Sequence, residues 1–371
     1  MVTMLTEGLA TINREGLKGL EKILFELKIA SFYRSNKPIA PTTAALYLHA
    51  RCNLSCSMCW RRTDFAAERL KQEEVPVSRW EETILELAEM GCKSIKFSGG
   101  GEPLLYSGFL KLAELAKGLD MHCVLTTNGI LLDKQMKGAL DKIGWDEVTI
   151  SLDGPTEEIN NRIRGAGFDR VIKNIAESQD RSFKLYLQTV IQFENCNSLG
   201  EMLDLVKKYG IDGIKFIPVY DWNGEQIDFD IDDELSRVYE KAKSLNIQTN
   251  LSSLMNGGYK LKKAKENCFF PWFYCLIDEL GDVKSCCNPA VTRDTTISMG
   301  NVNNENIRDI WTGKAFNELR EQFRKGAFMG ACSRCFSSTI KFNNELDIQI
   351  SKMHLSNIRN EIVKHEIIER E

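Results

Sequence analysis

The sequence contains little histidine and no long uncharged stretch. Four histidines occur among 371 residues, and none forms a pair with metal-binding spacing, so histidine-based hydrolysis and a histidine-rich metal site are disfavoured. Every uncharged run is shorter than the roughly 18 residues that a membrane-spanning helix needs; residues 39–50 give 12, and the longest run, residues 244–259, gives 16. Residues 1–9 lack a basic stretch followed by an apolar one, so no secretion signal is predicted.

No charge of one sign dominates the chain. The sequence has 48 basic and 52 acidic residues, which argues against binding to a nucleic-acid backbone and against a polybasic membrane anchor. Twelve cysteines without an export signal indicate thiols kept reduced for metal binding or catalysis, not a disulfide framework. We therefore expect a cytoplasmic protein that binds neither nucleic acid nor membrane.

From residue 43 the hydrophobic pattern alternates between strand-like and helix-like segments. Strand-like runs lie at residues 43–50, 93–98, 121–126, 146–152, 185–192, 213–219 and 246–251. This alternation predicts an α/β fold with a parallel sheet and right-handed crossovers, closed into a partial (β/α)6 TIM-like barrel or left open. In such a fold the residues that carry chemistry gather at the carboxyl ends of the strands.

The pattern also predicts how the chain is divided. The repeat of strand and helix ends near residue 255, and the next 85 residues are richer in cysteine and aromatic residues, with a hairpin signal at 273–278 and 283–286. The expected parts are an N-terminal helical extension (1–40), a main α/β domain (41–255), a smaller domain (256–340) and a C-terminal helical tail (341–371).

Three cysteines, Cys52, Cys56 and Cys59, follow the first predicted strand in one loop. Their spacing allows the three thiolates to meet at one metal centre. A structural zinc site would need a fourth ligand, for which only His49 is near. A cubane iron–sulfur cluster held by three thiolates instead leaves one iron with an open position, as a reactive centre requires.

The Cys52-x3-Cys56-x2-Cys59 pattern after a first strand resembles the radical S-adenosylmethionine (SAM) superfamily. The resemblance implies a [4Fe–4S] cluster that chelates SAM, reductive cleavage of SAM to methionine and a 5′-deoxyadenosyl radical, and abstraction of a substrate hydrogen. It also implies a flavodoxin- or ferredoxin-type electron donor. Met58 stands where the family usually has an aromatic residue, next to the adenine through its backbone.

Polar and glycine-rich motifs at later strand ends extend the resemblance. Gly100, Gly101 and Glu102, within Ser-Gly-Gly-Gly-Glu-Pro, resemble the family motif that binds the SAM amino group. The resemblance suggests Asn128 for the ribose, and Ser151 and Arg164 for the SAM carboxylate. Weaker candidates for the SAM end of the cleft are Gln188 and Asn195.

A second cysteine set lies in the smaller domain. Its members are Cys268, Cys286, Cys332 and Cys335. Four soft ligands from two chain segments fit a tetrathiolate site, with zinc as the competing occupant. The Cys-x12-Gly-x4-Cys spacing resembles SPASM and Twitch domains. No cysteine follows Cys335, so the resemblance is to the shorter Twitch type with one auxiliary [4Fe–4S] cluster, which implies electron transfer with a substrate radical.

The resemblance to Twitch-bearing enzymes favours dehydrogenation or epimerisation of a sugar or aminocyclitol by a radical SAM oxidoreductase. Cys275 and Cys287 are candidate hydrogen donors, and Asp221 and Trp222 are expected to face the substrate. Cys92, Cys123 and Cys196 are expected to be inert. The alternatives are a peptide-modifying maturase and, outside enzymes, a zinc-stabilised binding scaffold. The first 40 residues hold one predicted helix, which leaves no room for a separate leader-peptide domain and argues partly against the maturase.

Overall fold

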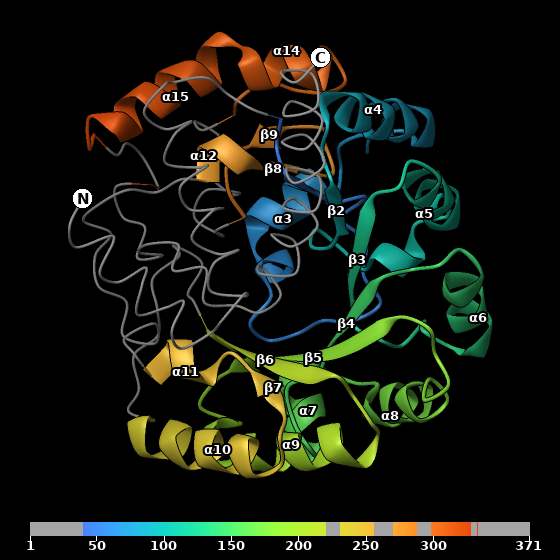
Figure 1. The fold of residues 1–371 in the computed structure, drawn as a ribbon, viewed down its shortest axis with the longest axis vertical. Coiled ribbons are helices and arrows are strands. Elements are labelled where there is room, and N and C mark those ends of the chain that lie inside the picture. Colours follow the sequence, from blue (N-terminus) through green and yellow to red (C-terminus); the bar gives the residue numbers. More distant parts are fainter. Residues whose placement is uncertain (1–39, 220–230, 256–269, 288–297, 328–331, 333–371) are drawn as a thin grey trace, which may run out of the picture.

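A computed structural model describes residues 40–219, 231–255, 270–287, 298–327 and 332 (Figure 1). The predicted N-terminal helix and C-terminal tail lie outside the described residues, as do Asp221, Trp222, Cys268 and Cys335. No helix among the described residues is both long and apolar enough to cross a membrane.

The described residues form a nine-stranded sheet in the order β7-β6-β5-β4-β3-β2-β1-β8-β9. The strands are β1 (Thr43–Leu46), β2 (Ser94–Phe97), β3 (His122–Thr127), β4 (Glu147–Ser151), β5 (Lys184–Ile191), β6 (Gly213–Pro218), β7 (Gln248–Thr249), β8 (Tyr274–Ile277) and β9 (Val283–Lys284). All neighbouring pairs are parallel except β8 with β9. The predicted α/β class with a mostly parallel, barrel-like sheet is confirmed.

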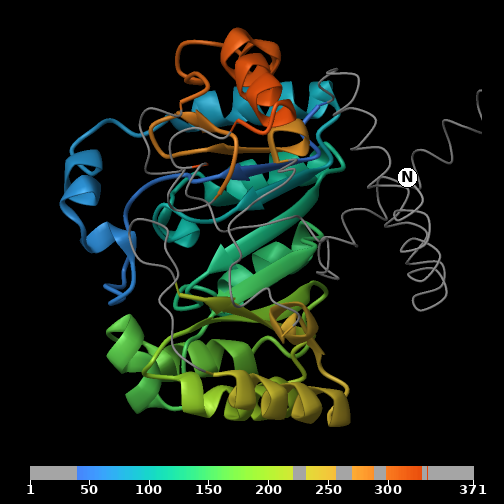
Figure 2. The same ribbon diagram turned by 90° about the vertical axis from the view of Figure 1, so that its left-hand side faces the viewer.

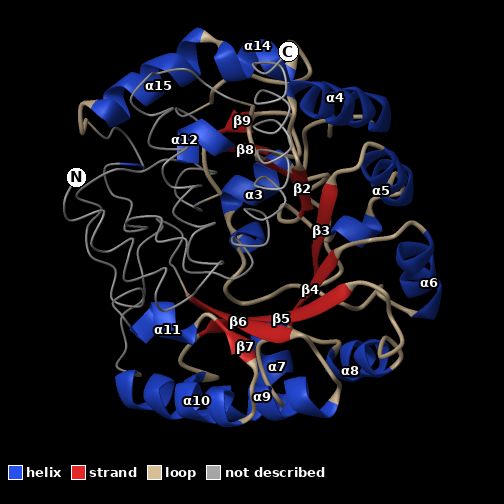
Figure 3. Ribbon diagram, viewed as in Figure 1, coloured by secondary structure: helices blue, strands red, loops and turns tan. Residues whose placement is uncertain are grey.

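Helices cover the convex side of this curved sheet (Figures 1 and 3). The α-helices are α3 (Asp64–Arg69), α4 (Val77–Met90), α5 (Phe109–Gly118), α6 (Lys134–Lys142), α7 (Glu157–Arg164), α8 (Phe168–Ala176), α9 (Leu199–Lys208), α10 (Asp232–Ser244), α11 (Leu251–Ser253), α12 (Phe270–Phe273), α14 (Ile307–Thr312) and α15 (Lys314–Arg324). Short 3-10 helices are η1 (Trp60–Arg62), η2 (Pro103–Leu105) and η3 (Cys196–Ser198). Figures 1 and 2 both show α14 and α15 at one end of the molecule and α10 at the other.

The two faces of the sheet differ in chemistry because successive side chains of a strand point to opposite faces. On the helix side, Leu46, Phe97, Leu125, Leu187 and Phe216 belong to one fully buried apolar core. The other, concave face therefore carries the intervening residues of the same strands. These residues include Lys96, Thr126, Thr149, Ser151, Gln188 and Lys215. The concave face is thus the polar face of the sheet.

The predicted hairpin is present and extends the main sheet. Strand β8 pairs in parallel with β1, from Thr43 opposite Tyr274 to Leu46 opposite Ile277, and β9 then turns back against β8. This pairing gives hydrogen-bond partners to the backbone groups on the edge of β1 that does not face β2. The sheet therefore crosses the domain boundary predicted near residue 255, and the division into domains stays a prediction.

Arg79 joins helix α4 to the segment that precedes α14. Its guanidinium donates to both carboxylate oxygens of Glu86, at 2.8 and 3.2 Å, and to the carbonyl of Glu305 at 3.1 Å. Glu86 in turn accepts a hydrogen bond from Ile307 N at 2.8 Å, in the first turn of α14. The Arg79 side chain is only 14% exposed, so its charge is held mainly by these groups.

We predict that Arg79→Ala lowers the free energy of unfolding by about 2–3 kcal/mol, because it leaves a half-buried carboxylate and backbone carbonyls without their donor. Denaturant unfolding followed by tryptophan fluorescence measures the change. The control is Arg162→Ala, since Arg162 is 58% exposed and pairs with Glu158, four residues earlier on the same helix; its effect should stay below about 0.5 kcal/mol. Equal effects of both variants would contradict the assigned role of Arg79.

Candidate functional site

The loop after β1 brings three half-buried thiols to the carboxyl edge of the sheet. Within it Cys59 N donates to Cys56 O at 3.1 Å, and Ser57 N donates to Ile163 O at 2.8 Å, which fixes the loop against α7. Burial raises the pKa of Cys56 to about 11, and the positive charge of nearby Arg164 opposes this shift. A thiol with such a pKa keeps its proton at neutral pH until a metal displaces it.

The donor set fits a cubane cluster better than a zinc ion. Among the described residues, no three Cys, His, Asp or Glu side chains lie close enough together to hold a single metal ion. A cubane distributes its three protein ligands over three different irons, so its thiolates need not meet at one point. The fourth zinc ligand considered above, His49, is engaged elsewhere, because its Nε2 lies 2.8 Å from the Glu102 carbonyl oxygen.

The glycine-rich loop after β2 lies directly on the chain that leads from β1 to the thiols. Gly101 N donates to His49 O at 2.6 Å, and Glu102 N donates to Arg51 O at 2.8 Å. Gly100 has a φ of +62°, and a Cβ on it would lie 2.7 Å from His49 O. A Cβ on Gly101 would overlap Arg51 O. The sequence predicted close approach of a ligand, whereas the structure shows that these two glycines are required by the neighbouring backbone.

Glu102 links this loop to the end of β3. Its side chain is 2% exposed and accepts hydrogen bonds from Thr127 Oγ1 at 2.6 Å and from Asn128 N at 2.7 Å. Burial raises the pKa of Glu102, and these donors partly offset the shift. The carboxylate is thus already bound by protein donors, and its expected contact with the SAM amine stays a prediction.

Asn128 reaches from β3 to the cysteine loop. Its Nδ2 donates to Asn53 Oδ1 at 2.7 Å and lies 3.8 Å from Cys52 Sγ. Its Oδ1 accepts from Ile130 N at 3.0 Å, which turns the chain after β3. The expected ribose ligand is therefore next to the first thiol.

Arg164 and Asp153 form a buried ion pair at the ends of β4 and α7. Their Nη2 and Oδ2 atoms are 2.7 Å apart, and Asp153 is fully buried. Burial raises the pKa of Asp153, while the Arg164 charge and the Val190 N–H lower it. Arg164 Nε is buried and has no hydrogen-bond partner in the described part of the chain, so the guanidinium keeps a donor available near Cys56. The sequence indicated Arg164 as a site residue but did not indicate Asp153, which lies two residues after Ser151.

The remaining SAM candidates also lie at strand ends. Ser151 is half-buried at the end of β4, directly opposite Gln188 on β5. Asn195 has a structural role instead, because its Nδ2 donates to Asp153 O and Val190 O, both at 2.8 Å. Met58 is half-buried in the cysteine loop. The structure thus brings the predicted residues to neighbouring strand ends, and their contacts with SAM stay predictions.

The two candidate hydrogen donors lie on opposite faces of the sheet. Cys275 is fully buried in the core between the sheet and the helices, near Cys92, so its expected contact with substrate is wrong. Cys287 lies beside Tyr274 on the other side. The Cys286 thiol lowers the pKa of Cys287 to about 6, and Lys96, Tyr274 and Lys215 contribute in the same direction. Cys92, Cys123 and Cys196 are buried with raised pKa values, as inert thiols would be.

Two of the four expected auxiliary ligands can be placed. Cys286 is half-buried just after β9, and half-buried Cys332 packs against Trp272, Leu319 and Phe323. Next to Leu319, fully buried Arg320 donates to Pro271 O and Trp311 O, but its Nη2 has no hydrogen-bond partner in the described segments. Burial lowers the pKa of Arg320 to about 9. The guanidinium instead lies over two aromatic rings, with its Cζ 4.5 Å from the Trp311 ring centroid and 4.9 Å from the Phe316 ring centroid.

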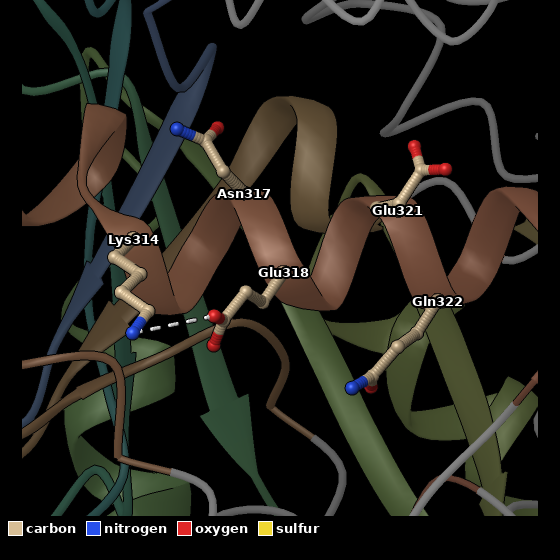
Figure 4. Close-up of a pocket in the computed structure, with 5 residues that line it drawn as sticks. All are labelled: Lys314, Asn317, Glu318, Glu321 and Gln322. Carbon is tan, nitrogen blue, oxygen red and sulfur yellow. Dashed lines mark ion pairs between the residues drawn. The ribbon is translucent and has the colours of Figure 1, made fainter.

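One surface hollow lies beside α15 and is separate from these thiols. Figure 4 shows its lining side chains, which all project from α15. They are Lys314, Asn317, Glu318, Glu321 and Gln322. Lys314 and Glu318 pair at 3.7 Å across one helical turn, as solvated surface charges do. We assign no function to this hollow.

A buried ion network connects the segment after the cysteine loop to the β8–β9 turn. Arg69 on α3 pairs with Asp278 at 2.7 Å and with Glu279 at 2.6 Å, and all three side chains are less than a tenth exposed. Val75 N also donates to Glu279 O at 3.1 Å. Burial raises the pKa of Asp278 to about 7; the Arg69 charge opposes this shift, and the charges of Glu279 and Asp282 add to it.

We predict that the free energy of unfolding decreases as the pH rises toward about 7. The reason is that the folded state binds the Asp278 proton more tightly than the unfolded state does. Glu279→Gln removes one of the charges that raise this pKa. The loss of unfolding free energy between about pH 5.5 and about pH 8 should therefore shrink by about 1 kcal/mol. Denaturant unfolding at both pH values tests this, with Glu318→Gln, whose side chain is 61% exposed on α15, as control. An unchanged difference in Glu279→Gln would contradict the prediction.

The sheet and the site define a class of protein: a partial α/β barrel with a three-thiol metal centre at its carboxyl edge and further cysteines beyond. Residues 46–215 match the family model described as Radical SAM superfamily, and residues 268–336 match that of an iron–sulfur cluster-binding domain. The chain therefore carries a radical SAM domain followed by a SPASM-type iron–sulfur domain, and these domains imply a [4Fe–4S] cluster with SAM and auxiliary iron–sulfur binding. The resemblance predicted from the cysteine motifs is confirmed.

Several named proteins are similar in sequence to part or most of this chain. Fe-coproporphyrin III synthase of Methanosarcina barkeri is 30% identical over 190 residues, which are 51% of this chain and 45% of that enzyme. The match therefore spans less than half of that relative. Mycofactocin maturase MftC of Mycolicibacterium smegmatis is 24% identical over 310 residues, 80% of this chain and 76% of that protein. Streptococcus suis SuiB, solved with the precursor peptide SuiA, has a similar fold, with a TM-score of 0.63, 20% identity, and coverage of 81% of this chain and 72% of SuiB.

Proposed function

We propose that this radical SAM enzyme modifies a peptide substrate. The observation that carries the proposal is the match to mycofactocin maturase over 80% of the chain, which is more than the radical SAM domain at residues 46–215 alone spans. SuiB, with its precursor peptide, shares the fold. These relatives favour the peptide alternative over the sugar or aminocyclitol substrate that the cysteine spacing suggested.

In this proposal Cys52, Cys56 and Cys59 hold the SAM cluster. When bound, the cluster and SAM supply a 5′-deoxyadenosyl radical that removes a hydrogen atom from the substrate. Reduction comes from a flavodoxin- or ferredoxin-type donor. Cys268, Cys286, Cys332 and Cys335 hold the auxiliary cluster.

The strand ends supply the SAM-binding groups. The backbone of Met58, Gly100 and Gly101 and the side chain of Glu102 lie at the amino-group and adenine end. Asn128, which lies beside the cysteine loop at the end of β3, binds the ribose. Arg164 binds the carboxylate with the guanidinium donor that Asp153 leaves available, and Ser151 assists from β4.

The concave face supplies the peptide site. Lys96 on β2 and Lys215 on β6 both act electrostatically on Cys287, so two positive charges flank one region of this face. Such charges suit a carboxylate of the substrate. Cys287, beside Tyr274, is retained as the candidate thiol for hydrogen return, because it lies on this face and Cys275 does not.

The iron content distinguishes the two clusters. Anaerobically purified protein should contain about eight irons per chain, as two cubanes require. We expect Cys52→Ala/Cys56→Ala/Cys59→Ala and, separately, Cys286→Ala/Cys332→Ala each to reduce this to about four. Iron and sulfide assays with an optical spectrum measure it, and Cys123→Ala, a buried core thiol, serves as control. Bound zinc without iron would contradict the assignment.

The substrate class is tested by product analysis with reconstituted enzyme, SAM and reductant. Peptides encoded beside the gene should become modified, and deuterium from a labelled peptide should appear in 5′-deoxyadenosine. Mass spectrometry follows both products. A porphyrin-type substrate is the second candidate, because the relative from Methanosarcina barkeri is named Fe-coproporphyrin III synthase. Deuterium transfer from a labelled porphyrin, or a carbonyl product from an aminocyclitol, without peptide modification would overturn the peptide proposal.

A further inference from the structure

His49 occupies a central place among the strand ends. It lies three residues beyond β1 and three residues before Cys52, and its side chain is 1% exposed. Its ring is tilted against the ring of Tyr106, with centroids 5.6 Å apart. A buried histidine in this position is either a core residue or part of the machinery that shapes the site.

Two separate atoms of His49 hold the glycine-rich loop. Its carbonyl oxygen accepts from Gly101 N at 2.6 Å, and its ring Nε2 lies 2.8 Å from the carbonyl oxygen of Glu102. A carbonyl oxygen can only accept, so Nε2 carries the proton and donates. The glycine-rich loop is therefore bound to His49 through two of its own backbone groups, the N–H of Gly101 and the C=O of Glu102.

The remaining ring nitrogen supports the same tautomer. Nδ1 is buried and has no hydrogen-bond partner among the described residues. Burial lowers the pKa of His49, against the smaller opposing effect of its hydrogen bond to Glu102 and of the Glu74 charge. The neutral ring leaves Nδ1 as an unprotonated atom, whereas a proton there would be buried without an acceptor.

The hydrogen bonds that begin at His49 continue to both sides of the site. Beyond Glu102, the chain of hydrogen bonds runs to Thr127 and Asn128 at the end of β3. From Asn128 it returns to Asn53, next to Cys52. A displacement of the Glu102 backbone would therefore move the expected SAM-binding loop and the expected ribose ligand together.

We propose that His49 is a positioning residue for SAM: it fixes the backbone of residues 99–102 in the binding conformation without touching SAM itself. The inference rests on the SAM-binding assignment of this loop in the proposed function. It predicts a defect in SAM affinity that is separate from any defect in folding or cluster content.

Two substitutions of opposite character test the inference. His49→Phe keeps the ring volume against Tyr106 but removes the donor, so the Glu102 carbonyl loses its partner. His49→Gln replaces the ring by an amide whose N–H reaches a similar position. We expect His49→Phe to weaken SAM binding about tenfold, equivalent to about 1.4 kcal/mol, and His49→Gln to stay within about threefold of wild type.

The measurement is anaerobic calorimetric titration of the iron-loaded protein with SAM, together with iron content and thermal midpoint. His122 provides the matched control, because it is also buried but pairs with Glu147 at 3.1 Å at the amino end of β3. His122→Phe should lower the thermal midpoint and leave SAM affinity unchanged. If His49→Phe fails to accumulate, His49→Asn, whose amide is too short to reach the Glu102 carbonyl, replaces it.

Wild-type SAM affinity in the donor-free His49 variant would overturn the inference. So would a weakening in His122→Phe equal to that in the His49 variant, which would indicate a general effect of stability. Both results leave the proposed function intact, because no peptide enters the titration. Iron-loaded wild-type protein that bound no SAM would instead overturn the SAM-binding assignment and this inference together.

Discussion

The contact between the glycine-rich loop and residues 49–51, which follow β1, is the constraint on which the site depends. Residues 49–51 and 101–102 meet backbone to backbone, so close that a Cβ at Gly100 or Gly101 would meet a carbonyl oxygen. Only glycine allows this approach. The contact places the loop that carries the three thiols beside the end of β2, and Glu102 then ties both to β3.

The sequence was sufficient for the order of elements and for the motifs, since both depend on local pattern. The runs at 93–98 and 121–126, for example, correspond to β2 and β3, and the motif residues after them meet because parallel strands end at one edge. Long-range pairing could not be read in this way. The partnership of β8 with β1 and the ion pair of Asp153 with Arg164 join segments whose proximity no local pattern encodes.

Strand register explains why one candidate thiol was misplaced. Cys275 and Cys287 were equivalent in sequence, but alternation along β8 turns Tyr274 to the concave face and Cys275 to the helix-side core. A shift of the β8 register by one residue would turn Cys275 to the concave face and Tyr274 to the core. The sequence likewise indicated His49 only as a metal ligand, because its hydrogen bond to a backbone carbonyl 53 residues away leaves no signature in the sequence.

The position of β8 relates the two sulfur-bearing regions. Strand β1 has β2 on one side, which leads to the glycine-rich loop, and β8 on the other, which leads through the 278–282 turn to β9 and Cys286. Because β9 runs back against β8, Cys286 lies deeper than the strand ends, and its neighbour Cys287 reaches Tyr274. Arg69 meanwhile holds the turn against the segment that follows the first thiols. Lys96 on β2 and Lys215 on β6 lie on the concave face of the same sheet whose strands lead to these two cysteine-bearing segments.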